Sequence, residues 1–417
     1  MSDTAARGAS APLSFADPAV QQCPFAAYDA LRDDQPVYRD PLTNNYVLTR
    51  YADVRRALMQ PDALANRTGL NMTRQSTVAQ EAQRRYREHG YEPIDTLVTN
   101  DPPSHRLYRS LVDKAFTTPR VHAIESGIAA IIAELIDGFV SQGECEFLSR
   151  FAVPLPMRVI AGQLGVQSGD MDAFKRWSDV SVEQVSPVLE PERELEIVDT
   201  IIEMQNYLAD VIRRVRDAPE DNLISDLANA DVDGRQGTMQ EIIGIVHQLL
   251  VAGNETTTTT LASGMRVLAQ DPALLDGLRA DPEQAARFAE EVLRAHSPIQ
   301  TLFRKAVREV EIGGVTIPAG AIVEVRYGAA NRDPERFEAP DRFDPERANA
   351  SSHLAFGAGI HMCVGNQLAR GELRLAFAEL ARRLRSVRLA RGNRSVEMLD
   401  SYIAYGPRRL WIAFDCA

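Results

Sequence analysis

The chain has 417 residues, 45% of them hydrophobic, so it is long enough to bury a large core. Its formal net charge of −12 argues against a nucleic-acid partner. The four cysteines (Cys23, Cys145, Cys363 and Cys416) are too widely spaced for a zinc motif or a disulfide-dense scaffold, so reduced thiols in the cytoplasm are expected. No apolar run is long enough for a membrane span, which predicts a protein without membrane contact.

The first hundred residues are predicted to contain a flexible arm and a few short elements. Residues 1–24 are rich in Ala, Ser and Pro, lack a signal-peptide pattern and are expected to form the arm, with one domain spanning residues 25–417. The predicted elements are strands at Val37–Tyr38 and Tyr46–Leu48 and a helix at Tyr51–Met59. Residues 60–98 are polar and weakly periodic, which predicts a long loop with broken helix.

Residues 103–300 have a mostly helical pattern, and one predicted helix is much longer than the others. Thr238 and Glu241 form a capping box at its start, and Asp271–Pro272 is the next stop signal, so the helix should reach about Ala269. About 31 residues at 1.5 Å each span roughly 45 Å, enough to cross the molecule. Apolar residues around much of its circumference predict that this helix is buried.

The last third of the chain mixes helices with short strands. A helix is expected to begin at Asp281–Pro282 and to end at Ser297–Pro298. Short strands joined by tight turns are predicted within residues 307–326, followed by a meandering loop over residues 331–362. A final helix is expected from about Gly365 to Leu384. The predicted fold class is therefore mainly α with a small β part.

Three glycines surround one cysteine in residues 356–365, Phe-Gly-Ala-Gly-Ile-His-Met-Cys-Val-Gly. Glycine permits positive φ and a close approach of the backbone to a flat ligand. Cys363 directly precedes a predicted helix, whose N-terminus should lower the pKa of the thiol and favour thiolate. A lone cysteine in such a turn is more often an ordinary buried thiol, but the whole pattern resembles the haem-binding loop of cytochrome P450 enzymes.

This resemblance implies a single P450-type domain that holds haem b between the long helix and the helix after the cysteine. It implies that Cys363 is the axial ligand of the iron, that Phe356 packs near the sulfur and that His361 reaches a haem propionate. Gly357 and Gly365 belong to the same cofactor-binding loop.

The middle of the long helix breaks the local rules for a helix. Glycine and a run of five threonines, Thr256 to Thr260, are poor helix formers, and such violations tend to mark functional sites. The alternative is a polar kink with Glu255 in solvent and packed threonines. The segment starting at Ala252 resembles the family's Ala-Gly-x-acid-Thr groove over the iron, which implies that Ala252 faces the cofactor and that Glu255 and Thr256 relay protons, with Thr257 as a weaker candidate.

Glu291 and Arg294 are three residues apart on one helix face, a pattern that alone indicates only an exposed ion pair. In this order along the chain it resembles the family's Glu-x-x-Arg helix, which implies a structural lock with Arg347. The run Asp-Pro-Pro-Ser-His followed by Arg109 also resembles a family helix. The resemblance implies four propionate-binding cations, each of which alone could be a surface charge: His105, Arg109, Arg304 and His361.

The implied function is insertion of one atom of O2 into an apolar small molecule of terpenoid, steroid, aromatic or polyketide-like type. Because no Gly-x-Gly-x-x-Gly nucleotide motif is present, electrons should come from an external 2Fe-2S ferredoxin and its reductase. The protein is expected to be monomeric. A peroxide-driven oxygenase and a haem sensor without turnover are the alternatives. The expected substrate-lining residues are Leu70, Asn71, Met72, Leu249, Ala252, Ile299, Leu302 and Ile403, with Gln300 as a further polar group.

Overall fold

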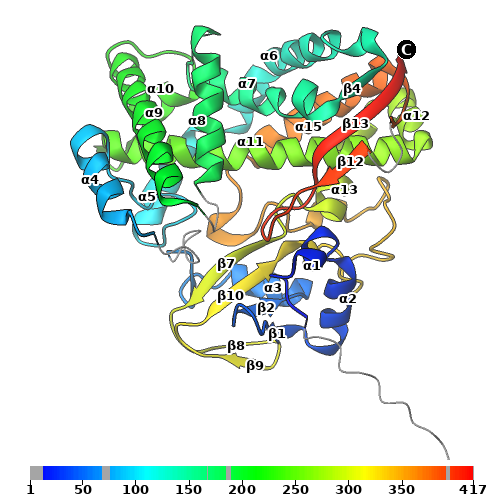
Figure 1. The fold of residues 1–417 in the computed structure, drawn as a ribbon, viewed down its shortest axis with the longest axis horizontal. Helices are drawn as coiled ribbons and strands as arrows, with labels where there is room; N and C mark the ends of the chain where they lie inside the picture. The colour runs from blue at the N-terminus through cyan, green and yellow to red at the C-terminus, as the bar shows by residue number, and fades with distance from the viewer. Residues whose placement is uncertain (1–12, 68–75, 167, 185–188, 391–394, 417) are drawn as a thin grey trace, which may run out of the picture.

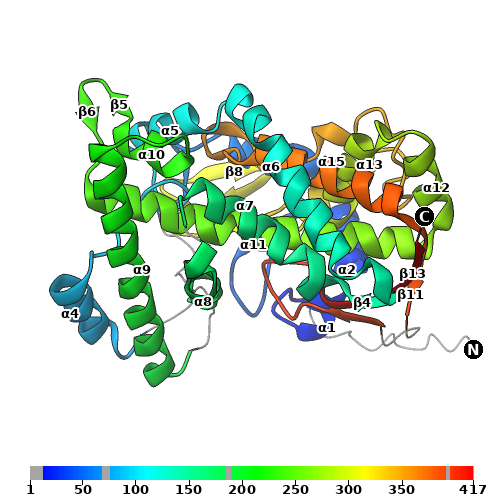
Figure 2. The same cartoon turned by 90° about the horizontal axis from the view of Figure 1, so that it is seen from above.

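One long helix, α11 (Met239–Gln270), crosses the whole molecule, and the other elements are arranged around it (Figures 1 and 2). The computed structural model describes residues 13–67, 76–166, 168–184, 189–390 and 395–416. The capping box is present as predicted: the Thr238 side chain accepts from the Glu241 backbone N–H, and the Glu241 carboxylate accepts from the backbone N–H of Thr238. These bonds satisfy two donors that a helix start otherwise leaves unpaired.

Helices make up most of the described chain, which confirms the predicted fold class. Those before α11 are α1 (Pro18–Gln22), α2 (Phe25–Asp34), α3 (Tyr51–Leu58), α4 (Ala79–His89), α5 (Ser104–Ala115), α6 (Thr118–Asp137), α7 (Pro154–Gln163), α8 (Met171–Glu183), α9 (Pro191–Asp217) and α10 (Leu223–Asn229). Those after it are α12 (Pro272–Ala280), α13 (Gln284–His296), α14 (Tyr327–Ala330) and α15 (Asn366–Arg383).

The strands form two small sheets and two hairpins. A five-stranded sheet below α11 in Figure 1 has the order β1 (Val37–Arg39), β2 (Tyr46–Leu48), β10 (Ile322–Arg326), β7 (Thr301–Ala306) and β3 (Leu64–Ala65). A second sheet, at one end of α11, joins β11 (Leu384–Leu389), β13 (Pro407–Cys416), β12 (Val396–Met398) and β4 (Glu144–Glu146). The hairpins are β5 (Asp231–Val232) with β6 (Arg235–Gln236) and β8 (Val310–Ile312) with β9 (Val315–Ile317).

Of two Asp-Pro pairs, one ends a helix as predicted and the other does not start one. The helix expected to start at Asp281–Pro282 begins at Gln284, because the Asp281 carboxylate accepts from the backbone N–H of Glu283 and holds a turn before the helix. Asp271–Pro272 ends α11 and also starts α12, with the Asp271 side chain accepting from the backbone N–H of Ala273. An Asp-Pro pair therefore marks a boundary without fixing which helix turn follows.

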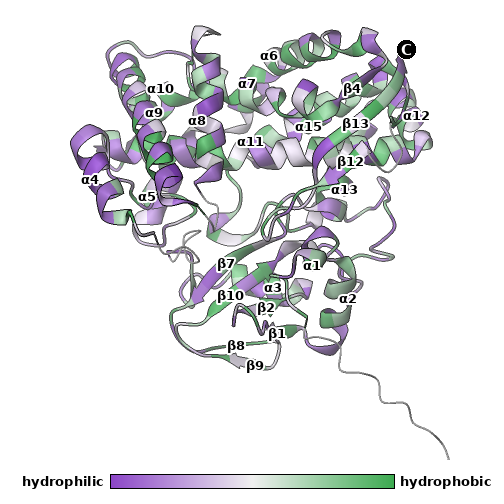
Figure 3. Cartoon of the chain, viewed as in Figure 1, coloured by the Kyte–Doolittle hydropathy of each residue, from purple (hydrophilic) through white to green (hydrophobic). Residues whose placement is uncertain are grey.

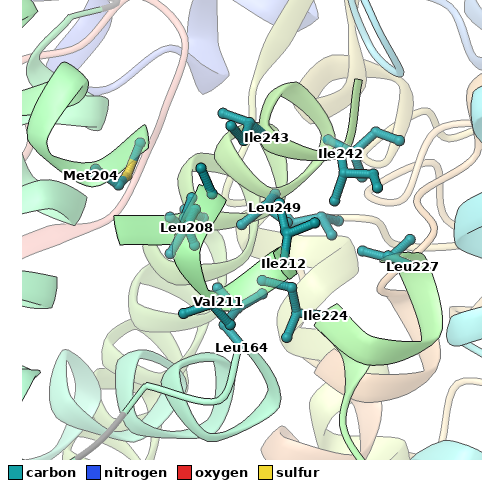
Figure 4. Close-up of a cluster of buried hydrophobic side chains, with 14 of the residues drawn as sticks. Leu164, Met204, Leu208, Val211, Ile212, Ile224, Leu227, Ile242, Ile243 and Leu249 are labelled. Atoms are coloured by element: carbon teal, nitrogen blue, oxygen red, sulfur yellow. The ribbon is translucent and has the colours of Figure 1, made fainter. Parts of the chain in front are cut away.

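Packing against α11 defines a large part of the core. The cluster in Figure 4 brings side chains from α7, α9, α10 and α11 together, and Leu249 lies within it beside Leu208 and Ile212. Hydrophilic residues dominate α4, which packs against α9 through Ala82 and Tyr86 (Figure 3). The apolar stripe of α4 explains why a helix forms inside the region predicted as a loop with broken helix.

Within the predicted arm of residues 1–24, the described part, residues 13–24, contacts the rest of the protein. Phe15 is 1% exposed, and the Ser14 hydroxyl donates to Asp40 at 2.8 Å. Among the described residues, no helix combines the length and the apolar character that a membrane span needs.

Candidate active site

The cysteine loop is a closed turn that leads into α15. The backbone N–H of Cys363 donates to the carbonyl of Phe356 at 2.9 Å, and Gly357 and Gly359 have φ of +68° and +71°. A Cβ at Gly359 would lie 2.6 Å from the carbonyl oxygen of Leu58, so this turn accepts only glycine there.

Opposing effects act on the pKa of the Cys363 thiol. Burial raises the pKa of the Cys363 thiol, whereas the backbone N–H of Gly365 and the charges of Arg109 and Arg370 lower it. The backbone N–H has the predicted lowering effect, but the net direction is upward because burial is the larger effect. Burial outweighs the helix start because α15 begins at Asn366, three residues beyond the sulfur.

Open space interrupts the buried surface of α11 at its middle. Ala252 and Gly253 are exposed, although buried residues precede and follow them along the helix. A Cβ built on Gly253 would meet nothing within 4 Å. A helix that is buried at both ends and accessible at its centre leaves open space beside that centre, which is where a ligand could be placed.

Glu255 and Thr256 are partly accessible beside this space. Burial raises the pKa of Glu255, and no charged or hydrogen-bonding group of the described residues contributes to that shift. The Thr256 hydroxyl donates to the carbonyl of Ala252 at 2.9 Å. Thr257, the weaker candidate, is buried, and the Thr258 hydroxyl is used by the carbonyl of Ala152. The helix geometry therefore favours Thr256, among these threonines, as the candidate for the predicted proton relay.

The four predicted cations form a connected group between α5, β7 and the cysteine loop. The rings of His105 and His361 are 4.3 Å apart. Arg304 lies close enough to His361 to lower its pKa, and Arg109 has the same effect on His105. Arg109 also donates to the carbonyl of Met362 at 2.5 Å and to Asp113 at 2.8 Å, which ties α5 to the loop.

Of this group, Arg109 is paired with Asp113, and Asp101 lies 3.7 Å from Nε2 of His361, whereas Arg304 has no such partner in the described part of the chain. Arg304 is 5% exposed, donates to the carbonyl of Phe303 and has no carboxylate partner among the described residues. Both ring nitrogens of His361 are buried without a hydrogen-bond partner there, and burial together with His105 and Arg304 lowers the His361 pKa to about 3. A buried guanidinium is costly unless it is paired, so the site is suited to a ligand that carries carboxylates.

Glu291 and Arg294 form a buried ion pair. Both side chains are fully inaccessible, and the two hydrogen bonds between them are each 2.7 Å long. Nε of Arg347 lies 3.3 Å from Glu291, and Arg294 also donates to the carbonyls of Asn331 and Pro340. The pair thus holds α13 to the meander that precedes the cysteine loop.

The predicted substrate-lining residues are distributed over several places. Ile299 bridges to Ala404, and the neighbouring Gln300 N–H donates to the carbonyl of Ile403 at 2.6 Å, so Ile299, Leu302 and Ile403 lie in one region. Leu249 is 8% exposed and packs in the apolar cluster of Figure 4, although it lies on the same helix face as Ala252 and Gly253. Residues 70–72 lie outside the described part of the chain.

Two glutamines, Gln300 and Gln248, differ from what the sequence predicts for the pocket. Gln300 is not a free polar group, because its amide accepts from the hydroxyl of Tyr28 and donates to the carbonyl of Ser297. Gln248, which the sequence did not single out, is tied to residues 98 and 99 by two hydrogen bonds. Its position four residues before Ala252 on the same helix face was the available signal.

Comparisons with known proteins agree with this geometry. The Cytochrome P450 family model matches residues 45–388. The chain is 36% identical over 384 residues to Cytochrome P450 107B1 of Saccharopolyspora erythraea, with 91% of each chain covered. It is 34% identical over 393 residues to the Vitamin D(3) 25-hydroxylase of Pseudonocardia autotrophica, with 93% of each covered. The structure of CYP109Q5 from Chondromyces apiculatus matches with a TM-score of 0.86 and 34% identity, over 97% of this chain and 98% of that one.

The chain therefore belongs to the cytochrome P450 family. It is a P450 monooxygenase, an oxidoreductase that incorporates oxygen from O2, and the family implies a haem. The residues fit that group: Cys363 offers a sulfur, and the glycines leave room for a flat ring. Among the described residues, Arg304 has no carboxylate partner and the ring nitrogens of His361 have no hydrogen bond, and propionates would fill both needs.

Proposed function

We propose that this protein hydroxylates an apolar small molecule, with haem b held by Cys363 on one side and by α11 on the other. The observation that carries the proposal is the open, partly polar middle of α11, because a structural helix would be packed there. When bound, the haem supplies oxygen activation and one-electron chemistry. His105, Arg109, Arg304 and His361 are the groups proposed to hold its propionates.

Glu255 and Thr256 are proposed to hold and deliver protons in the space above the cofactor. Reduction of O2 in a dry pocket consumes protons, so a positioned acid is needed. A carboxyl whose pKa is raised by burial keeps its proton to higher pH, and the Thr256 hydroxyl, anchored on Ala252, can orient a water molecule. We expect Glu255→Gln and Thr256→Ala to retain substrate binding while less of the consumed NADH appears as product and more as hydrogen peroxide.

The proposed substrate class is a rigid, apolar polycycle of steroid or terpenoid type. The relative named Vitamin D(3) 25-hydroxylase supports this class, since it covers nearly the whole chain. Ile299, Leu302 and Ile403 provide the apolar surface expected for such a ligand. A spectral titration with steroids, terpenes and small aromatic compounds tests the class, and a response restricted to small aromatics would overturn it.

An external ferredoxin and its reductase are proposed as the electron source in the cytoplasm. Met362 and Ile360 of the cysteine loop are exposed, as is Met59 beside Gly359, so an apolar patch lies on the surface nearest the sulfur. Arg109 is paired with Asp113 and is assigned to a propionate, so docking is proposed to rest on this apolar patch. Reduction by a 2Fe-2S ferredoxin that slows in Met362→Glu is the expected result.

Glu255 and Thr256 also weigh against a peroxide-driven oxygenase, in which an arginine replaces the acid–threonine pair. A haem sensor would need a second protein ligand to the iron in place of a proton-donating groove. Turnover with ferredoxin and NADH, compared with turnover by hydrogen peroxide alone, separates the three functions. Product formed only with peroxide, or none in either case, would contradict the proposal.

A further inference from the structure

A charged network that the sequence did not predict lies behind the cysteine loop. Arg370 on α15 donates to the Glu290 carboxylate at 2.6 Å and to the side chain of Asn366 at 2.8 Å. Nε2 of His353 lies 3.4 Å from the same carboxylate. Burial alone would raise the pKa of Glu290, but the bonds from His353 and Arg370 outweigh it and lower the pKa to about 2. Glu290 is therefore ionised, and it faces a fixed guanidinium.

This network reaches Cys363 along two routes. The amide of Asn366, which accepts from Arg370, donates to the carbonyl of Cys363 at 2.6 Å. The guanidinium carbon of Arg370 also stands 4.6 Å from the ring centroid of Phe356, whose carbonyl accepts from the backbone N–H of Cys363. The loop that carries the sulfur is thus held from behind by one arginine.

The adjacent carboxylates Glu290 and Glu291 have separate partners. Glu291 is paired with Arg294 and supports the meander, whereas Glu290 is paired with Arg370, the arginine behind the cysteine loop. Arg370 and Glu290 are 31% and 15% exposed, so solvent screens the pair only partly.

We infer that Arg370 and Glu290 are positioning residues that set the reduction potential of the iron bound through Cys363. This inference rests on the proposed function. A cation behind the sulfur stabilises the added electron, and a carboxylate there opposes it. In the native protein the two charges have opposite effects on the reduction potential, so each charge offsets the effect of the other.

The two charges therefore have opposite effects when removed. Arg370→Gln leaves the Glu290 carboxylate uncompensated and should lower the potential, whereas Glu290→Gln leaves the guanidinium uncompensated and should raise it. Each change is expected to alter the one-electron equilibrium constant by about three- to tenfold, and a tenfold change corresponds to 59 mV. The double variant should return close to the native potential, and Arg370→Lys should restore part of it.

A matched control lies one helical turn further along α15. Arg374 pairs with Glu125 at 2.8 Å, and their side chains are 37% and 25% exposed. Arg374→Gln and Glu125→Gln remove comparable charges from a pair that makes no hydrogen bond or ion pair with the described residues of the cysteine loop, so the potential should stay at its native value.

The experiment is a spectroelectrochemical titration of the haem-loaded protein and these variants, with the reduced carbon monoxide spectrum recorded for each. Opposite shifts for Arg370→Gln and Glu290→Gln, with unchanged controls, support the inference. Shifts of the same sign, no shift, or equal shifts in the Arg374 and Glu125 controls would overturn it. If the native protein itself lacks the thiolate-type carbon monoxide band, the proposed function fails, which is a separate outcome.

Discussion

The side-chain amide of Asn254 donates a hydrogen bond of 2.8 Å to the hydroxyl of Ser178, so the middle of α11 is joined to α8 inside the protein. Both residues are buried, and the amide oxygen of Asn254 has no partner among the described residues. The open segment of α11 is thus held by a polar contact on the side opposite to Thr256, as their spacing of two residues dictates.

Loss of this contact should destabilise the fold. Ser178→Ala leaves the buried amide of Asn254 without its acceptor, which is expected to cost about 1–3 kcal/mol of unfolding free energy. Asn254→Leu removes both polar atoms and should cost less. Urea unfolding followed by the Soret absorbance measures both, with the surface change Thr200→Ala as the control. Equal stability of Ser178→Ala and the native protein would contradict the account.

Gly253→Ala should make the fold more stable and at the same time slow ligand binding. Alanine is favoured over glycine in a helix by about 1 kcal/mol, and the new methyl group would meet no protein atom within 4 Å, so the fold should become more stable. The same methyl group narrows the open space beside α11, so carbon monoxide should bind the reduced protein more slowly.

Gly127 on α6 provides the control for this change, because a Cβ there also meets nothing within 4 Å. Gly127→Ala should stabilise the protein without affecting carbon monoxide binding, measured by flash photolysis. Unaltered binding in Gly253→Ala would show that the space beside α11 is not the ligand space.

Breaking the Glu291–Arg294 pair should be far more damaging than breaking an exposed pair. Arg294→Ala leaves a buried carboxylate with only Arg347 and the backbone N–H of Asp344 as partners among the described residues, at an expected cost of about 3–5 kcal/mol and with loss of bound haem. Arg176→Ala breaks a pair with Glu203 that is half exposed and should cost under about 1 kcal/mol. Thermal unfolding and the haem-to-protein absorbance ratio give both values, and similar losses in the two variants would refute the distinction.

The pH dependence of stability should contain a contribution from Glu372. Burial raises the pKa of this carboxyl to about 8 from its ordinary 4.5, so between those values the folded state binds more protons than the unfolded state. Stability therefore falls as pH rises through this window, by at most about 1.4 kcal/mol per pH unit, and no penalty exists below it.

Glu372→Gln removes this titration, so its stability relative to the native protein should increase from pH 5 to pH 8. Denaturant unfolding at pH 5, 6.5 and 8 measures the difference, with the exposed Glu309→Gln as the control. A difference that stays constant with pH, or decreases towards pH 8, is incompatible with a neutral buried carboxyl.

Helix α11 was predictable from sequence because all its signals are local. The capping box at Thr238 and the Asp-Pro stop at residue 271 define it almost to the residue. Strand β7 was missed because its run Thr301–Ala306 alternates poorly and because one of its partners, β3, comes from a distant part of the chain. The C-terminal sheet was missed for the same reason, since β13 pairs with β4 from residues 144–146.

The candidate site was predictable where a short motif carries it. The motifs located Cys363, Glu255 and Thr256, but no motif marks the network of Arg370 and Glu290, which comes from two helices 80 residues apart in sequence. The direction of the Cys363 pKa was also beyond the sequence, because burial depends on everything packed around the loop.

The central claim is that the sulfur of Cys363 binds the haem iron, and its most direct test is the reduced carbon monoxide difference spectrum of Cys363→Ser. The account predicts that the native protein and Cys23→Ser show the red-shifted Soret band of a thiolate-bound haem, and that Cys363→Ser lacks it while keeping its far-ultraviolet circular dichroism. A red-shifted band that persists in Cys363→Ser would contradict the account.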